Sequence, residues 1–468
     1  MSAEPPREVE PAIALLCPRC GATSPADARL CRLCYASLEG ATRVAAPTAT
    51  RRRLSLRPPS TLRGWVALAV AVVVLLVAAS WVRGWLEGPP PPFPAVGGQR
   101  TAEAPGAAWA VPGGALEGGR ETVATPVLQG LSWRWEASSA PTTPVVTDGD
   151  ALYLGLEEGV LVSIGAFDGL ERWRARVPGV LESAPAIAEG RLYAGYRSGG
   201  VAALDAASGD PVWEAQLGVS ISTTPLVVDG IVFVAGNGVL GGFDAEDGTQ
   251  IWQRRIDDSV VPVTPVIDGE TLVVATFDRV LLIDRRNGEL LSWTSLAPEH
   301  APISGLALRD GVAFVVANGR VMAVSTSMRR PWWDGVRPVW EFLHVLGAAP
   351  DPPWRPDLWS VDTPPGQARS AIAGPLLVVA GAHGVRAYER TSGGLAWAAA
   401  VDAPGAAPVA TAAGVLVAGA GEGWLLDDRD GRVLAAWEFE GEAIDALTVE
   451  FGSFVITREG IAAFLGDG

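Results

Sequence analysis

Short apolar runs broken by turn residues recur with a fixed period over most of the chain. One unit holds an apolar run, an Asp-Gly or Glu-Gly turn, a second apolar run, a Gly-rich turn, and then a phrase such as "ALDAASGDPVW" at 203–213. Two runs joined by such a turn are typical of a β-hairpin. The Trp residues that end successive phrases lie 39 to 41 residues apart, at positions 173, 213, 252 and 293. This period predicts one four-stranded propeller blade per repeat.

Three residue types in the phrase have a structural explanation. We expect the Asp that ends the third strand to accept hydrogen bonds from backbone N–H groups of the following turn. We expect the Gly four residues later to adopt a positive φ, and the Trp to pack between neighbouring blades. The Asp residues are Asp205, Asp244, Asp284 and Asp427, and the Gly residues are Gly209, Gly248, Gly288 and Gly431.

The pattern predicts an all-β protein with an eight-bladed propeller, and seven blades are the alternative. A fifth unit begins at 303–325, but an irregular stretch replaces its last turn, and Trp340 is the expected docking ring there. The sixth and seventh units follow, and their docking rings are Trp397 and Trp437.

The last blade is expected to combine both ends of the repeat region. The stretch 445–464 supplies three strands, and "LSWRWEA" at 131–137 supplies a fourth, with Trp133 or Trp135 in the docking position. Pairing the first strand with the last would close the ring and remove open sheet edges. The propeller is therefore predicted to span 131–468.

Four cysteines near the N-terminus form two C-x-x-C pairs within "CPRCGATSPADARLCRLC". Two such turns supply four thiolates in the tetrahedral arrangement that structural Zn²⁺ prefers, and metal binding would supply the folding energy of so short a segment. Four unrelated thiols, or two redox-active pairs, are the alternative. We expect a disordered N-terminus over 1–16 and a zinc domain over 17–38. The expected ligands are Cys17, Cys20, Cys31 and Cys34.

This segment resembles the short bacterial zinc-ribbon family. Beyond the cysteines, it shares Pro18, Gly21, Pro25 and Ala28 with the usual family pattern. It departs from that pattern at Leu30 and Tyr35, where the family usually has Phe and Gly. The resemblance implies a structural zinc site.

An uncharged stretch at 64–82 follows a basic linker at 39–63. Its 19 residues would form a helix of about 28 Å, close to the hydrocarbon thickness of a membrane, with Trp65 and Trp81 near its ends. We expect one transmembrane helix that remains as a signal anchor; a cleaved signal peptide is the alternative, which the long preceding segment disfavours. A Pro-, Gly- and Ala-rich linker at 83–130 follows.

Charge predicts the orientation in the membrane. Residues 1–63 carry ten Arg against five acidic residues, and residues 64–468 carry 26 Arg against 47 acidic residues. Basic residues stay on the cytoplasmic side, and thiolates suit a reducing compartment. We expect a single-pass protein of the cytoplasmic membrane, with a cytoplasmic N-terminus and an extracytoplasmic propeller. The acidic propeller makes nucleic acid an unexpected partner.

The propeller repeat resembles the quinoprotein-like family, named for pyrroloquinoline quinone (PQQ). One branch of that family contains quinone-dependent alcohol dehydrogenases, and another contains non-enzymatic propellers such as a lipoprotein that helps assemble outer-membrane proteins. The dehydrogenase branch implies a vicinal Cys pair, a Ca²⁺ site and a catalytic Asp. No Cys follows position 34, so PQQ is not expected and no catalytic residue is assigned.

Other catalytic patterns are weak. His300, His344 and His383 lack a ligand-like spacing, and "GNGVLG" at 236–241 lies between two strands rather than before a helix, where a dinucleotide would bind. An insertion at 326–368 is rich in Trp and Pro. Exposed Trp residues are common interface anchors, so this insertion is either a partner-binding patch or a private core on the propeller face. Its Trp residues are Trp332, Trp333, Trp340, Trp354 and Trp359.

Together these features predict a membrane-anchored, non-enzymatic propeller that acts as an extracytoplasmic protein-interaction or envelope-assembly scaffold. The first alternative is a transmembrane sensor that couples external ligand binding to the zinc ribbon. The second alternative is a PQQ-dependent dehydrogenase.

Overall fold

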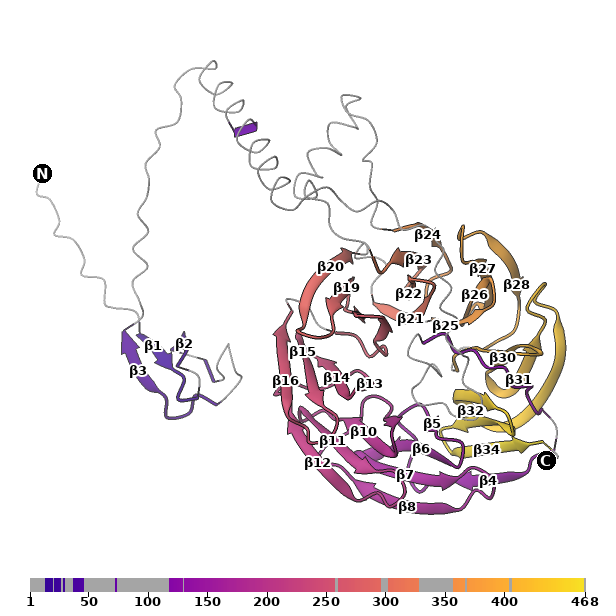
Figure 1. The fold of residues 1–468 in the computed structure, drawn as a ribbon, viewed down its shortest axis with the longest axis horizontal. Coiled ribbons are helices and arrows are strands. Elements are labelled where there is room, and N and C mark those ends of the chain that lie inside the picture. The colour runs from indigo at the N-terminus through magenta and orange to yellow at the C-terminus, as the bar shows by residue number, and fades with distance from the viewer. Residues whose placement is uncertain are drawn as a thin grey trace, which may run out of the picture. The chain divides into compact units, whose positions relative to one another are not determined.

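The computed structural model describes two compact units, Met1–Val77 and Ala78–Gly468 (Figure 1). The described residues are 13–19, 21–26, 28–29, 37–45, 72–73, 118–128, 130–256, 260–295, 302–327, 357–366, 368–403 and 406–466.

The first unit contains a three-stranded antiparallel sheet in the order β2-β1-β3. Its strands are β1 (Ile13–Leu16), β2 (Thr23–Pro25) and β3 (Thr42–Ala45). Leu15, Cys17 and Leu38 form a small buried cluster beside them. Strand β1 falls in the segment expected to be disordered, and β3 falls in the expected basic linker. The folded part of this unit is therefore wider than the 17–38 that the cysteine spacing indicated.

The expected membrane span lies almost entirely outside the described residues. Of residues 64–82, the structure describes only Val72 and Val73. No helix in the described part of the protein is both long and apolar enough to cross a membrane.

The second unit consists of antiparallel sheets arranged in sequence order around a common centre (Figure 1). The described residues form six four-stranded sheets, all built from strands consecutive in the sequence, and one larger sheet. A single 3₁₀ turn, η1 (Glu157–Gly159), interrupts the first of them. These observations define an all-β propeller.

The first three four-stranded sheets use β5 to β16. Their strands are β5 (Val146–Thr147), β6 (Ala151–Leu156), β7 (Val160–Gly165), β8 (Glu171–Arg176), β9 (Ala186–Ala188), β10 (Arg191–Gly195), β11 (Gly200–Asp205), β12 (Pro211–Gln216), β13 (Leu226–Val228), β14 (Ile231–Gly236), β15 (Val239–Asp244) and β16 (Gln250–Arg255).

The next three use β17 to β28. Their strands are β17 (Val266–Asp268), β18 (Thr271–Ala275), β19 (Arg279–Asp284), β20 (Glu289–Ser295), β21 (Ile303–Arg309), β22 (Val312–Ala317), β23 (Arg320–Ser325), β24 (Trp359–Asp362), β25 (Ala368–Ala373), β26 (Leu376–Gly381), β27 (Gly384–Glu389) and β28 (Leu395–Ala399).

The larger sheet joins both ends of the propeller. Its order is β29-β30-β31-β32-β33-β34-β4. The long β32 pairs with β31 up to Glu442 and with β33 from Ala443 onward, so it serves two four-stranded groups. Strand β4 pairs with β34, which confirms the expected closure by the first and last strands. The strands are β29 (Val409–Thr411), β30 (Gly414–Ala418), β31 (Ala420–Leu426), β32 (Val433–Val449), β33 (Gly452–Thr457), β34 (Gly460–Leu465) and β4 (Trp133–Glu136).

The repeated phrase forms the joint between neighbouring sheets. Asp205 accepts hydrogen bonds from the N–H groups of Ala207 and Ser208, and Gly209 has φ +77°. Trp173 of the preceding sheet lies on this turn, since a Cβ added to Gly209 would lie 2.7 Å from its Cδ2 atom. The indole N–H of Trp173 donates to the Ala206 carbonyl at 2.8 Å. The roles predicted for Asp, Gly and Trp are therefore confirmed here.

The same joint recurs around the ring. The pairs of donating indole and accepting carbonyl are Trp133 with Ala166, Trp213 with Ala245, Trp252 with Arg285, Trp359 with Arg390, and Trp397 with Asp428. Trp133, and not Trp135, is thus the docking ring of the closing strand.

The docking ring of the irregular unit is Trp359 rather than Trp340. Trp359 begins β24, pairs with Ala323 of β23, and packs on Gly393 of the next sheet. The choice of Trp340 was therefore wrong, because spacing to the neighbouring repeats cannot place a strand that follows a long insertion. The insertion's other Trp residues, including Trp340, lie outside the described residues.

Residues 118–128, called the strap below, pack against the propeller ahead of the boundary expected at 131. Gly119 accepts a hydrogen bond from Ile372 N–H, and Arg120 accepts one from Ala410 N–H. Further along, the Val127 N–H donates to Ser453 Oγ at 3.1 Å. The strap therefore contacts β25, β29 and β33 before the backbone reaches β4. Part of the stretch expected to be a linker belongs to the packed unit.

Candidate functional site: the central pocket

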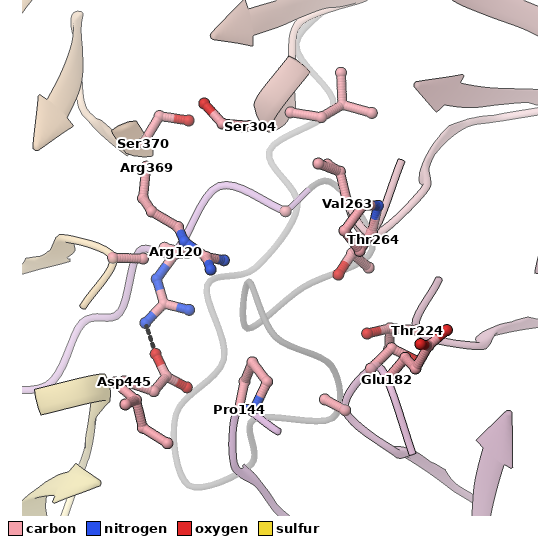
Figure 2. A pocket seen from close by; sticks show the side chains of 18 of the residues that line it. Arg120, Pro144, Glu182, Thr224, Val263, Thr264, Ser304, Arg369, Ser370 and Asp445 are labelled. Carbon is pink, nitrogen blue, oxygen red and sulfur yellow. Dashed lines mark hydrogen bonds and ion pairs between the residues drawn. The ribbon is translucent and has the colours of Figure 1, made fainter. Parts of the chain in front are cut away.

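A pocket of about 250 Å³ lies where the first strands of the sheets converge (Figure 2). Its lining comes from segments at the start of β5, β9, β13, β17, β21, β25 and β29, from the second part of β32, and from the strap. Because these segments lie far apart in the sequence, only the closed ring brings them together. The centre of an architecture of this kind is where a ligand would contact many elements at once.

Equivalent positions line the pocket in most sheets. Counting four residues back from the last residue of β9, β13, β17, β21, β25, β29 and β32 always reaches a lining residue. Five of these residues are small and uncharged, whereas β25 and β32 carry Arg369 and Asp445. In order they are Ala184, Thr224, Thr264, Gly305, Arg369, Ala407 and Asp445.

Asp445 is paired with a residue of the strap. Arg120 donates from Nη2 to Asp445 Oδ1 at 2.8 Å, and the two residues are only 6% and 2% exposed. The same guanidinium donates to the carbonyls of Pro408 and Ala446. Arg120 also has φ +49°, a left-handed backbone that residues other than Gly rarely adopt. This buried ion pair fixes the strap at the centre of the ring.

Arg369 is a second cation on the same side of the pocket (Figure 2). Its backbone is held on both sides, because Arg369 pairs with Ala380 and the Ser304 hydroxyl donates to the Ala368 carbonyl at 2.7 Å. The side chain is exposed, but to the space of the pocket. It makes no hydrogen bond or ion pair with any residue that the structure describes.

The electrostatic surroundings of Arg369 are unfavourable for its charge. Loss of hydration within the pocket lowers the pKa of the Arg369 guanidinium. The Asp445 carboxylate raises that pKa, and the Arg120 guanidinium lowers it. One carboxylate therefore faces two guanidinium groups, and this wall of the pocket has an excess positive charge.

The opposite wall is already neutralised. Figure 2 shows Glu182 and Thr224 across the pocket from Asp445. Glu182 accepts from Arg197 Nε at 2.6 Å and from the Ser220 hydroxyl at 3.3 Å. A ligand anion would therefore be attracted to the Arg369 side and not to the Glu182 side.

The described pocket residues do not fit a quinone with Ca²⁺. Ca²⁺ takes six to eight oxygen ligands and favours several carboxylates. The pocket's carboxylates, Glu182 and Asp445, lie on opposite walls and are each bonded to an Arg. Among the described residues no three His, Cys, Asp or Glu side groups gather as metal ligands would. The vicinal Cys pair is also missing, because all four Cys lie within 17–34.

Only one of the expected zinc ligands is described. Cys17 is buried and begins a tight turn in which the Gly21 N–H donates to the Cys17 carbonyl and the Cys17 N–H donates to the Ala22 carbonyl. Gly21 has φ +72°, so the backbone turns back directly after position 20. Cys20, Cys31 and Cys34 lie outside the described residues, and the four-sulfur site stays a prediction.

The remaining described candidates from the sequence are not among the residues that line the pocket. The glycine pattern at 236–241 forms the turn between β14 and β15, with Gly238 at φ +77°, which confirms its interpretation as a hairpin. His383 lies in the turn between β26 and β27. His300 and His344 lie outside the described residues.

The sequence interpretation missed Arg120, Arg369 and Asp445. The sequence contains a sign of Arg369 and Asp445, since most units have Thr-Pro or Ala-Pro just before their first strand, as at 224–225 and 407–408. The units at 369–370 and 445–446 replace that pair with Arg-Ser and Asp-Ala. Arg120 had no such sign, because it lies outside the repeat.

Comparison with known proteins agrees with the fold. The model of the family described as outer membrane protein assembly factor BamB matches residues 128–335 and 347–468. The protein therefore belongs to this family, and the predicted resemblance of its propeller repeat is confirmed. No curated protein sequence matches it significantly.

Solved structures with this fold include BamB and several dehydrogenases. BamB from Moraxella catarrhalis is 16% identical and has a TM-score of 0.58, and the match spans 72% of this protein and 99% of that one. Quinohemoprotein alcohol dehydrogenase from Comamonas testosteroni is 13% identical at a TM-score of 0.60, covering 79% and 82%. A europium-containing methanol dehydrogenase is 12% identical at 0.59, covering 77% and 90%. At these identities the likeness concerns the fold alone.

Proposed function

We propose that this protein is a membrane-anchored, non-enzymatic propeller of eight blades that acts as an extracytoplasmic scaffold for protein interaction in envelope assembly. The observation that carries this proposal is the central pocket: it is polar and charged, and its described donors do not suit the quinone and Ca²⁺ of the enzymes that share the fold. Membership of a family named for an assembly factor supports the same function. The count of eight blades is supported by β32, which serves two four-stranded groups.

Site-specific photo-cross-linking in cells tests the scaffold function. A photoreactive residue would replace Thr264 in the pocket, Trp340 in the Trp-rich insertion, or Arg255, an exposed residue of the outer strand β16. We expect one envelope protein to be captured from position 264 or 340 but not from 255, and to co-purify with the unmodified protein in a fixed ratio. Equal capture from all three positions, or none from any, would contradict the proposal.

The N-terminal segments complete the proposed layout. A zinc ribbon on the cytoplasmic side would precede a single membrane crossing at 64–82, supported by the Cys17 turn and by the charge difference across the uncharged stretch. The full-length protein should bind one Zn²⁺, and Cys17→Ser should lose it while Ser24→Ala keeps it. Equal zinc content in both variants would remove the ribbon from the proposal.

A further inference from the structure

We propose that the central pocket binds a peptide carboxylate on Arg369, either the C-terminal carboxylate of the partner or one of its acidic side groups. This inference rests on the scaffold function and specifies the chemistry that the pocket recognises. It uses Arg369, which occupies a repeat position where most of the other units have a small uncharged residue.

The pocket wall that carries Arg369 has more positive than negative charge. Arg120 and Asp445 neutralise each other at 2.8 Å, and Arg120 is further bonded to two carbonyl groups. Arg369 has no described partner, although it lies in a pocket where hydration is reduced. The guanidinium donors of Arg369 are therefore available to a ligand that supplies negative charge.

The planar guanidinium of Arg369 matches the shape of a carboxylate. A planar guanidinium can donate two parallel hydrogen bonds to one carboxylate, which selects that group over a point charge. Arg369 is the second residue of β25, and Ser304 bonds the backbone at the start of that strand, so the backbone that carries the guanidinium is held at the pocket wall before a ligand arrives.

The volume and the lining of the central pocket suit a small part of a peptide. A pocket of about 250 Å³ lies just below the range of about 300–1,000 Å³ that encloses drug-sized ligands, so it suits the end of a peptide or a single side group. Thr264 and Ser370 also line it, and their hydroxyl groups offer further hydrogen bonds to a peptide. The other carboxylate, Glu182, is bonded to Arg197 on the opposite wall.

Matched peptides test the inference on the purified full-length protein. The C-terminal pair is N-acetyl-dialanine with a free carboxylate and the same peptide as its amide. The acidic-residue pair is acetyl-Ala-Glu-Ala-amide and acetyl-Ala-Gln-Ala-amide. Equilibrium titration should show the charged member of at least one pair binding about tenfold or more tightly than its neutral partner. The pair that shows the difference identifies the source of the carboxylate.

Variants assign the effect to Arg369. In Arg369→Gln the ratio between charged and neutral peptides should fall to about one, and in Arg255→Gln it should stay as in the wild type. Arg369→Gln should melt at or above the wild-type temperature, because the guanidinium has no described partner to lose. A ratio near one in the wild type, or an unchanged ratio in Arg369→Gln, would overturn the inference.

The two proposals fail separately. If photo-cross-linking captures an envelope partner but neither peptide pair shows a charge preference, the carboxylate inference is wrong and the scaffold function stands. If the peptides show the preference but no partner is captured, the scaffold function is wrong and the anion site stands.

Discussion

Six Trp residues that the structure describes make the same contact between neighbouring sheets. In contrast, the seven equivalent positions of the repeat that line the central pocket carry side chains of different chemistry. The indole N–H groups all donate to the carbonyl that follows the third strand of the next sheet. At the centre, five of these positions carry small uncharged residues, and the other two carry Arg369 and Asp445. The joints therefore explain the stability of the ring, and the departures from the repeat indicate its function.

The largest expected effect comes from the centre. Asp445→Ala would remove the buried carboxylate that pairs with the Arg120 guanidinium, and we expect the propeller to lose about 3–5 kcal/mol of unfolding free energy. Glu440→Ala removes a partner of Arg134 that is 77% exposed, and should cost less than about 1 kcal/mol. Urea unfolding of the two variants measures the difference, and equal losses would mean that the central pair does not fix the strap.

The next effect concerns the turn on which each Trp lies. Gly248 and Gly190 have φ +76° and +73°, but only Gly248 would bring an added Cβ within 2.6 Å of Trp213. Gly190→Ala should cost about 1–2 kcal/mol through backbone strain alone. Gly248→Ala should cost about 1–3 kcal/mol more, because the indole must also move. Urea unfolding of the two variants measures both losses of unfolding free energy. Similar losses would show that Trp213 packing does not depend on Gly248.

A smaller effect separates two docking rings. The Trp213 N–H donates to the Ala245 carbonyl at 3.0 Å, whereas the buried Trp437 N–H has no acceptor among the described residues. Trp213→Phe should therefore cost about 0.5–1.5 kcal/mol more than Trp437→Phe, since both lose similar volume but only one loses a hydrogen bond. Thermal unfolding of the pair tests this, and a larger cost at Trp437 would contradict the assignment.

The joints could be predicted from the sequence because each depends on a local pattern. Asp205, Gly209 and Trp213 lie within one phrase, and their roles follow from turn geometry and a fixed period. The closing strand could also be predicted, since the last unit lacked a fourth strand that residues 131–137 could supply. Trp359 could not, because the insertion before it breaks the period.

The central pocket could not be predicted in the same way. Arg369 and Asp445 lie 76 positions apart, and Arg120 lies more than 200 positions before either. Their proximity depends on ring closure and on the path of the strap, which no local pattern encodes. The departure of Arg369 and Asp445 from the repeat pattern is visible in the sequence, but the repeat alone does not say which departures face the centre.

The most direct test of the account is reconstitution of the full-length protein with PQQ and Ca²⁺, followed by dye-linked oxidation of a primary alcohol. Because the described pocket offers two carboxylates on opposite walls and no Cys, we expect no stoichiometric uptake of the quinone and no dye reduction above the level of a cofactor-free sample. One quinone bound per protein molecule, together with alcohol-dependent dye reduction, would contradict the account and make the propeller an enzyme.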